Sequence, residues 1–130
     1  MRVAQIFLLL QALVLGGFGV AYFIYPQEMA NLTGMVLLQS AAIVDVRAYY
    51  GALQLGIAVF LLSSALRPSF LRPALSLLTL LFAALALGRL AGLYLEGTVG
   101  QSFNVYALGY ESASAVLAYV ALRLLERQPG

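Results

Sequence analysis

The sequence predicts an all-α membrane protein, a bundle of four transmembrane helices in up-down-up-down order. Apolar residues make up 63% of the chain and charged residues 9%, whereas soluble domains have about 45–50% and about 25%. Four apolar stretches reach the roughly 20 residues that a helix needs to cross a bilayer. The connections after the second and third stretches are short, which favours antiparallel neighbours. Residues 1–130 are therefore expected to form a single transmembrane domain.

The first span is expected over residues 3–25. It contains few polar residues, and it ends in aromatic side chains of the kind found at a membrane surface, followed by Pro26. A secretory signal peptide is the competing interpretation, because Arg2 could form its basic start. The apolar run is longer than that of a typical signal, and no small-residue cleavage motif follows it. A membrane span is therefore preferred.

Charges and prolines delimit the other spans. Residues 26–46 carry polar and acidic side chains, and their apolar piece at 35–38 is too short to cross a bilayer. We expect an outer loop along the membrane surface, with Pro26 as the first residue of a short helix. The remaining spans are expected over about 47–66, 73–95 and 103–125.

The basic residues indicate the orientation, because they concentrate on the cytoplasmic side of membrane proteins. In a four-span arrangement, one side carries Arg2, Arg67, Arg72, Arg123 and Arg127. The opposite loops are mainly acidic. Both termini are therefore predicted to be cytoplasmic.

The composition also excludes classes of function. The chain has no cysteine and no histidine, which excludes disulfides, thiol chemistry and the usual zinc and haem ligands. No metal and no cofactor are expected. The seven basic residues, all arginine, form no basic run, so nucleic acid is not an expected partner. Chemistry is left to carboxylates, arginine, tyrosine, hydroxyls and amides.

Two ionisable residues lie within the last two spans. Arg89 and Glu111 have apolar neighbours, among which a charge is costly unless it is paired or hydrated. At about 1.5 Å per residue, Arg89 lies about 7 Å below the outer end of its span and Glu111 about 10 Å below that of its own. Because a short turn joins these spans, the two side chains are predicted to meet.

A polar pocket open to the outer face is expected around this pair, because further polar residues begin at the same side. The candidate catalytic residues are Glu111, Arg89 and Tyr50, and the candidate ligand-binding residues are Arg47, Asp45, Gln54, Tyr94 and Asn104. A purely structural interpretation stands beside this one. In it, Arg89 and Glu111 form a buried ion pair that fixes helix register, and Asp45 complements a helix dipole.

Small residues are expected where helices touch, since apolar side chains gain little by leaving lipid. Gly88 and Gly92 form a GxxxG pair in the third span, and Gly16 and Gly19 share one face of the first. Such glycine faces would also allow a homo-oligomer.

The segment Asp45-Val-Arg47-Ala-Tyr49-Tyr50-Gly51 resembles the acidic-x-Arg-Ala-x-Tyr-Gly signature of a family of small bacterial four-helix membrane proteins known as a domain of unknown function. Gly88-Arg89-x-x-Gly92 and Glu111 match other recurrent positions of that family, and the architecture is similar to that of DoxX-like membrane proteins. The resemblance covers nearly the whole chain. One departure is Ala52, where the family often has a second glycine. The resemblance implies the fold, the site positions and a bacterial inner membrane, but no activity.

Three functions remain open at this point. In the first, the pocket binds a membrane lipid, quinone or other hydrophobic small molecule, with the arginines receiving an anionic or carbonyl head group. In the second, the protein is an isomerase, cyclase or epoxide-opening enzyme. Glu111 then acts as acid or base, while Arg89 and Tyr50 stabilise negative charge. In the third, it is an accessory subunit or a transporter. A transporter would have to be oligomeric, because the four spans of one chain leave little room for alternating access.

Overall fold

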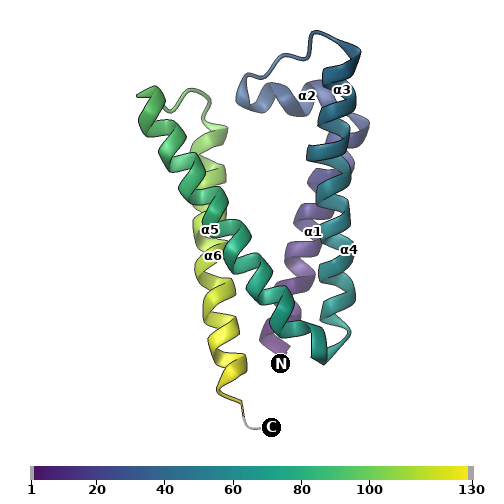
Figure 1. The fold of residues 1–130 in the computed structure, drawn as a ribbon, viewed down its shortest axis with the longest axis vertical. Coiled ribbons are helices and arrows are strands. Elements are labelled where there is room, and N and C mark those ends of the chain that lie inside the picture. Colours follow the sequence, from purple (N-terminus) through teal and green to yellow (C-terminus); the bar gives the residue numbers. More distant parts are fainter. Residues whose placement is uncertain (1, 129–130) are drawn as a thin grey trace.

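The computed structural model describes residues 2–128, and all regular secondary structure in this part of the chain is helical (Figure 1). This confirms the predicted all-α fold. Four helical segments are long and apolar enough to span a membrane, so the protein is a multi-pass membrane protein. The spans are α1 (Arg2–Ile24); α3 (Ser40–Val46), η2 (Arg47–Ala52) and α4 (Leu53–Ala65) in one run; η3 (Pro68–Phe70) with α5 (Leu71–Glu96); and α6 (Phe103–Glu126).

The spans form two antiparallel pairs. α1 packs along η2 and α4, and α5 packs along α6, with much less contact between the pairs. Figure 1 shows the pairs close together at the end that holds both chain termini, the terminal end, and diverging toward the opposite, distal end. The up-down-up-down order agrees with the sequence prediction. The packing differs from the compact bundle that was expected, because the pairs separate at the distal end.

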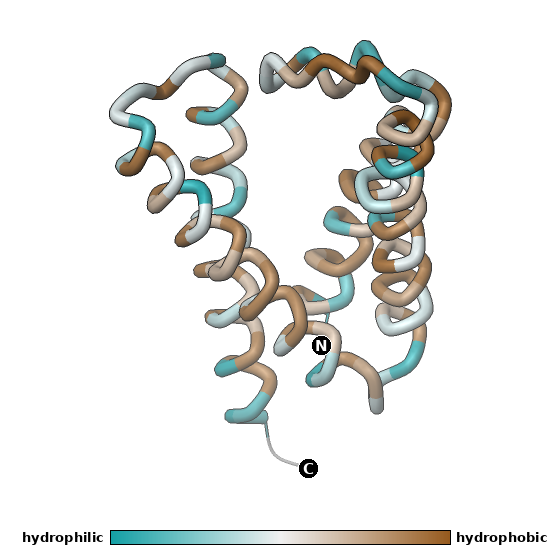
Figure 2. The backbone as a smooth tube through the Cα atoms, turned by 45° about the horizontal axis from the view of Figure 1, so that its top comes forward, coloured by the Kyte–Doolittle hydropathy of each residue, from teal (hydrophilic) through white to brown (hydrophobic). Residues whose placement is uncertain are grey.

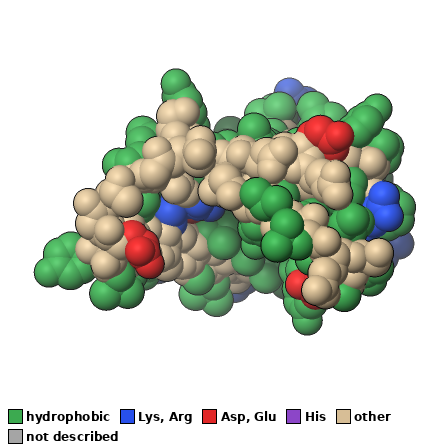
Figure 3. All heavy atoms as spheres, turned by 90° about the horizontal axis from the view of Figure 1, so that it is seen from above, with side chains coloured by type: hydrophobic (Ala, Val, Ile, Leu, Met, Phe, Trp, Pro, Cys, Tyr) green, Lys and Arg blue, Asp and Glu red, His purple; other side chains and the backbone are tan. Residues whose placement is uncertain are grey.

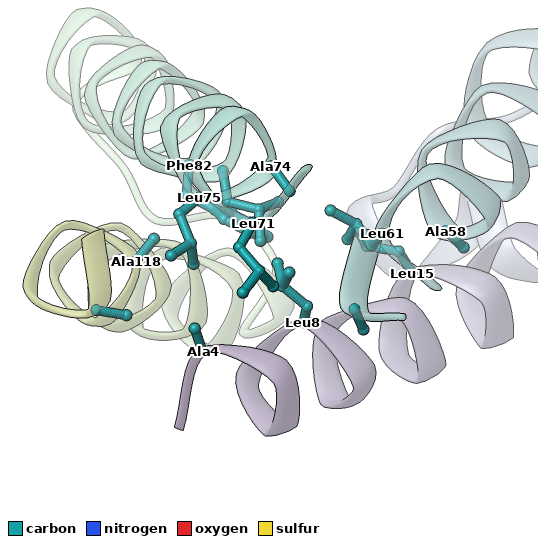
Figure 4. Close-up of a cluster of buried hydrophobic side chains, with 13 residues drawn as sticks. Ala4, Leu8, Leu15, Ala58, Leu61, Leu71, Ala74, Leu75, Phe82 and Ala118 are labelled. Carbon is teal, nitrogen blue, oxygen red and sulfur yellow. The ribbon is translucent and has the colours of Figure 1, made fainter. Parts of the chain in front are cut away.

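An apolar core holds the two pairs together at the terminal end. Leu8 of α1, Leu61 of α4 and Leu75 of α5 are fully buried in it, together with Phe82. Figure 4 shows these side chains meeting between α1, α4, α5 and α6, with small alanines between the larger residues. Small residues let helix backbones approach, which is how helices pack in lipid.

Within the first pair, the backbones approach closely at two glycines. A Cβ atom on Gly19 would lie 2.9 Å from the carbonyl oxygen of Gly51, and one on Gly51 would lie 3.2 Å from the backbone nitrogen of Phe23. Any larger residue would push α1 away from the second span. Gly51 belongs to η2, a stretch of π-helix, and such wide turns are frequent at functional sites.

The GxxxG pair of the third span does not pack inside the bundle, so that expectation is wrong. Gly88 and Gly92 are exposed, and a Cβ atom on either would meet nothing within 4 Å. The buried side of α5 is instead the one that carries Phe82 and Ala86. The glycine face of α5 is left open.

The connection between the first two spans is shorter than predicted. The second span begins at Ser40 rather than at Arg47, so helix replaces the last part of the expected loop 26–46. A short helix, α2 (Pro26–Ala30), does start at Pro26 as predicted, since proline suits the first position of a helix. It continues into η1 (Asn31–Thr33).

This connection crosses the distal end from one helix pair to the other. Gly34 ends η1 with a φ of 80°, a left-handed conformation that favours glycine. A Cβ atom on Gly34 would lie 3.4 Å from the side-chain nitrogen of Gln101, which belongs to the connection between α5 and α6. We call residues 26–34 the crossing segment.

Hydrophilic residues collect at the two ends of the molecule, and apolar residues dominate the middle (Figure 2). The chain termini and the α4–α5 connection share the terminal end (Figure 1). That end therefore carries Arg2, Arg67, Arg72, Arg123 and Arg127. The distal end carries Glu28 in α2 and Glu96 at the end of α5, and Asp45 and Arg47 lie in the first turns of the second span. This charge asymmetry follows the predicted pattern.

The glycine contact gives a direct test of the first helix pair. Gly19→Ala should lower the free energy of unfolding by about 1–3 kcal/mol, because its methyl group overlaps the second span. Gly17→Ala is the matched control in α1, since a Cβ atom there meets nothing within 4 Å. It should leave stability unchanged or raise it by up to about 1 kcal/mol. Thermal melting in detergent measures both, and equal melting temperatures would contradict the close approach.

Candidate functional site

Arg89 of α5 and Glu111 of α6 form an ion pair within the distal half of the second helix pair, as the sequence predicts. Nη2 of Arg89 lies 2.6 Å from Oε1 of Glu111, and Nε lies 3.1 Å from each carboxylate oxygen. The Glu111 side chain is 7% exposed and the Arg89 side chain 24%. A two-pronged contact of this kind fixes the orientation of the guanidinium group as well as its charge.

Asn104 completes this cluster from the first turn of α6. Its side-chain oxygen accepts a hydrogen bond of 2.8 Å from Nη1 of Arg89, and its amide nitrogen donates one of 2.9 Å to the carbonyl of Val99. Three of the five N–H groups of Arg89 are therefore used, by Nε, Nη1 and Nη2. Two remain available, one on Nη1 and one on Nη2.

A second polar cluster, which the sequence analysis did not identify, joins the two helix pairs. It lies nearer the terminal end than the Arg89 cluster. Gln11 of α1 donates a hydrogen bond of 3.0 Å to the hydroxyl of Ser114 and accepts one from the hydroxyl of Tyr110, both on α6. Tyr110 also packs edge-to-face against Phe82. Two signals pointed to it: Gln11 interrupts an apolar span, and Ser114 shares a helix face with Glu111.

Two tyrosines of the first helix pair lie near Arg89. The rings of Tyr22 and Tyr50 are tilted against each other, with centroids 5.3 Å apart. Both lie within electrostatic reach of the Arg89 guanidinium. Figure 3, which looks onto the distal end, shows basic side-chain atoms recessed below the surrounding surface. Tyr50 was a candidate from sequence, whereas Tyr22 was counted only among the aromatic residues at the end of the first span.

The other candidate residues lie elsewhere at the distal end. Arg47 donates a hydrogen bond of 2.9 Å to the carbonyl of Phe23 and stacks over its ring, so it caps the last turn of α1. Gln54 donates to the carbonyl of Tyr50 in its own helix, at 2.6 Å. Asp45 and Tyr94 are exposed. Within residues 2–128, none of these four side chains hydrogen-bonds to Arg89 or Glu111, and their ligand-binding roles stay predictions.

The ion pair gives a clear pattern of stability changes. Removing one partner leaves the other charge unpaired among apolar helices, so Arg89→Gln or Glu111→Gln should each cost about 3 kcal/mol. The double variant should recover most of this loss, because two amides replace the pair without a net charge. Arg123→Gln is the control, since it breaks an exposed pair with Glu126 and should cost under about 1 kcal/mol.

Thermal unfolding of the wild type and the four variants in the same detergent checks this pattern. A double variant as unstable as the sum of the single variants would show that Arg89 and Glu111 do not act as a pair.

Residues 3–122 match a protein family described as a domain of unknown function, DUF4345. The match covers the ion pair and the glycine contact of the first helix pair. No curated protein and no solved structure matches the chain. The similarity to DoxX-like proteins and the bacterial origin that the signature around Arg47 implied stay expectations. The chain belongs to the DUF4345 family of domains of unknown function.

Proposed function

We propose that the protein binds an amphiphilic small molecule of the membrane, a lipid, quinone or related compound, between its two helix pairs. The head group lies against Arg89 in the distal half, and the tail lies along apolar helix surface. The observation that carries this proposal is how the Arg89 side chain is paired and hydrogen-bonded. Its charge is matched by Glu111, its orientation is fixed, and two of its N–H groups remain available.

The apolar surface proposed for the tail lies on α1. A shallow depression of about 370 Å³, open on one side, lies along α1 beside α2, and it is lined by Leu13, Val14, Gly17, Phe18, Ala21 and Met29. Phe18 and Tyr22 are one turn apart on α1 and so share a face. A ligand with its head near Arg89 and Tyr22 can therefore place its tail beside Phe18. Polar groups that fix a head group within mostly apolar walls are the usual form of a small-molecule site.

The alternative functions receive less support from the geometry. Glu111 accepts hydrogen bonds from two N–H groups of Arg89, those of Nε and Nη2, so acid or base catalysis by Glu111 would require this contact to open first. A transport route would have to cross the apolar core at the terminal end, where Leu8, Leu75 and Leu78 are fully buried. Binding requires neither change.

The double variant Arg89→Gln with Glu111→Gln separates binding from folding, since it should keep its stability. The protein is reconstituted in nanodiscs made with host lipid extract and is released for native mass spectrometry. The wild type should carry an amphiphile of defined mass, and the double variant should lose it. Arg123→Gln should retain it. The same adduct on all three proteins would contradict binding at Arg89.

We also propose that the protein lies in a bacterial inner membrane with both termini in the cytoplasm. Support comes from the five arginines at the terminal end, because basic residues favour the cytoplasmic side. In this orientation the site opens toward the outside. A homo-oligomer through glycine faces would use α5, since Gly19 and Gly51 already contact each other within the chain.

Single cysteines test this orientation, because the natural chain has none. A cysteine at Ser69 should react with a membrane-impermeant maleimide only in inverted vesicles, and one at Thr98 only in intact cells. The reverse pattern would place the site on the cytoplasmic side.

A further inference from the structure

We infer that the head group of this ligand is an uncharged hydrogen-bond acceptor, such as the carbonyl oxygen of a ketone or ester, and that Tyr22 is a further residue that binds it. This inference rests on the proposed function, because it names the class of ligand that the same site takes.

The hydrogen-bonding groups around Arg89 are unevenly used. The acceptors are occupied: both oxygens of Glu111 and the side-chain oxygen of Asn104 receive N–H groups of Arg89. The Glu111 side chain is also nearly buried, so its remaining lone pairs are shielded. Most of the free hydrogen-bonding capacity is that of donors, namely two N–H groups of Arg89, and the tyrosine hydroxyls nearby can donate as well. A head group that accepts hydrogen bonds therefore fits this position best.

Tyr22 faces the second helix pair. It lies on the same face of α1 as Gln11, three turns nearer the distal end, and Gln11 bonds directly to Ser114 of α6. Counted from this bond, Tyr22 is about 16 Å higher on α1, and Asn104 is about 15 Å higher on α6. Tyr22 therefore reaches the level of the Arg89 cluster. At this level Tyr22 is near enough for the charge of Arg89 to act on its hydroxyl.

The hydroxyl of Tyr22 lacks a partner in the described part of the chain. The residue is only 7% exposed, and no hydrogen bond to its hydroxyl occurs within residues 2–128. The oxygen still keeps some accessible surface, because no side-chain oxygen in this range is both fully enclosed and unbonded. A buried tyrosine usually places its hydroxyl against a hydrogen-bond partner. A ligand oxygen supplies that partner here.

The charge balance selects the kind of acceptor. Arg89 and Glu111 together carry no net charge, so a carboxylate or phosphate would bring an unmatched negative charge into an apolar region, which is costly. A carbonyl oxygen accepts from the same donors without that cost. An alcohol or amine needs an acceptor for its own hydrogen, and around Arg89 only the tyrosine hydroxyls are left for that.

A carbonyl band in the infrared spectrum tests this inference directly. The wild-type protein is placed in nanodiscs of ether-linked zwitterionic lipid, which has no carbonyl of its own, and 2-undecanone labelled with ¹³C at its carbonyl is added. Hydrogen bonding to the site should shift part of the ¹³C=O band to lower frequency relative to empty nanodiscs. The double variant Arg89→Gln with Glu111→Gln should lack the shifted band.

Two comparisons then address the class of ligand and the role of Tyr22. Methyl decanoate should displace the ketone at least about tenfold more effectively than ionised decanoate at alkaline pH, which corresponds to about 1.4 kcal/mol. Tyr22→Phe should weaken binding of the ketone roughly fivefold, the effect of one neutral hydrogen bond. Tyr106→Phe is the matched control, because Tyr106 is 74% exposed, and it should bind as the wild type does. Circular dichroism verifies the fold of each variant.

The outcomes distinguish a failure of this inference from a failure of the proposed binding of an amphiphile at Arg89. If decanoate displaces the ketone better than its methyl ester does, or if Tyr22→Phe leaves ketone binding unchanged, the inference is overturned while binding of an amphiphile stands. If none of these compounds binds in a way that depends on Arg89, the proposed function fails as well.

Discussion

The distal half of this protein depends on the ion pair between Arg89 and Glu111. Each residue alone would place an unpaired charge among apolar helices, so each needs the other. Their contact joins α5 to α6, and it recruits Asn104 at the start of α6. The pair thus sets how the second helix pair is aligned and also creates the most polar position within the membrane-spanning part of the molecule.

The division into two helix pairs explains why this position stays accessible. Between the pairs, apolar packing is confined to the terminal end, and the polar bonds of Gln11 to Tyr110 and Ser114 lie above it. Farther toward the distal end the pairs diverge, and the crossing segment spans them (Figure 1). A bundle packed evenly along its length would have enclosed Arg89 completely. The divergence leaves part of its guanidinium group available.

The sequence predicted those parts of the structure that depend on spacing along one helix. The depths of Arg89 and Glu111 follow from helical rise, and their meeting follows from the short turn between their spans. Contacts between distant segments were harder to predict. Gly88 and Gly92 looked like a packing motif, but Gly19 and Gly51 make the close contact. Tyr22 was grouped with the interfacial aromatic residues at the end of the first span. The sequence does not show which helix packs against the face of α1 that carries it. The signature around Arg47 proved to contain this glycine contact and the cap of α1.

Stability alone does not account for the ion pair. Replacing a buried pair by well-packed apolar residues of similar volume often leaves a protein as stable or more so. Two leucines could hold α5 against α6, just as apolar side chains pack these helices together at the terminal end. Leucines cannot, however, present N–H groups to a third molecule. Because Glu111 neutralises and orients Arg89 without using all its donors, the pair makes a polar position that is uncharged overall and keeps two free N–H groups. The proposed binding of a ligand rests on that combination.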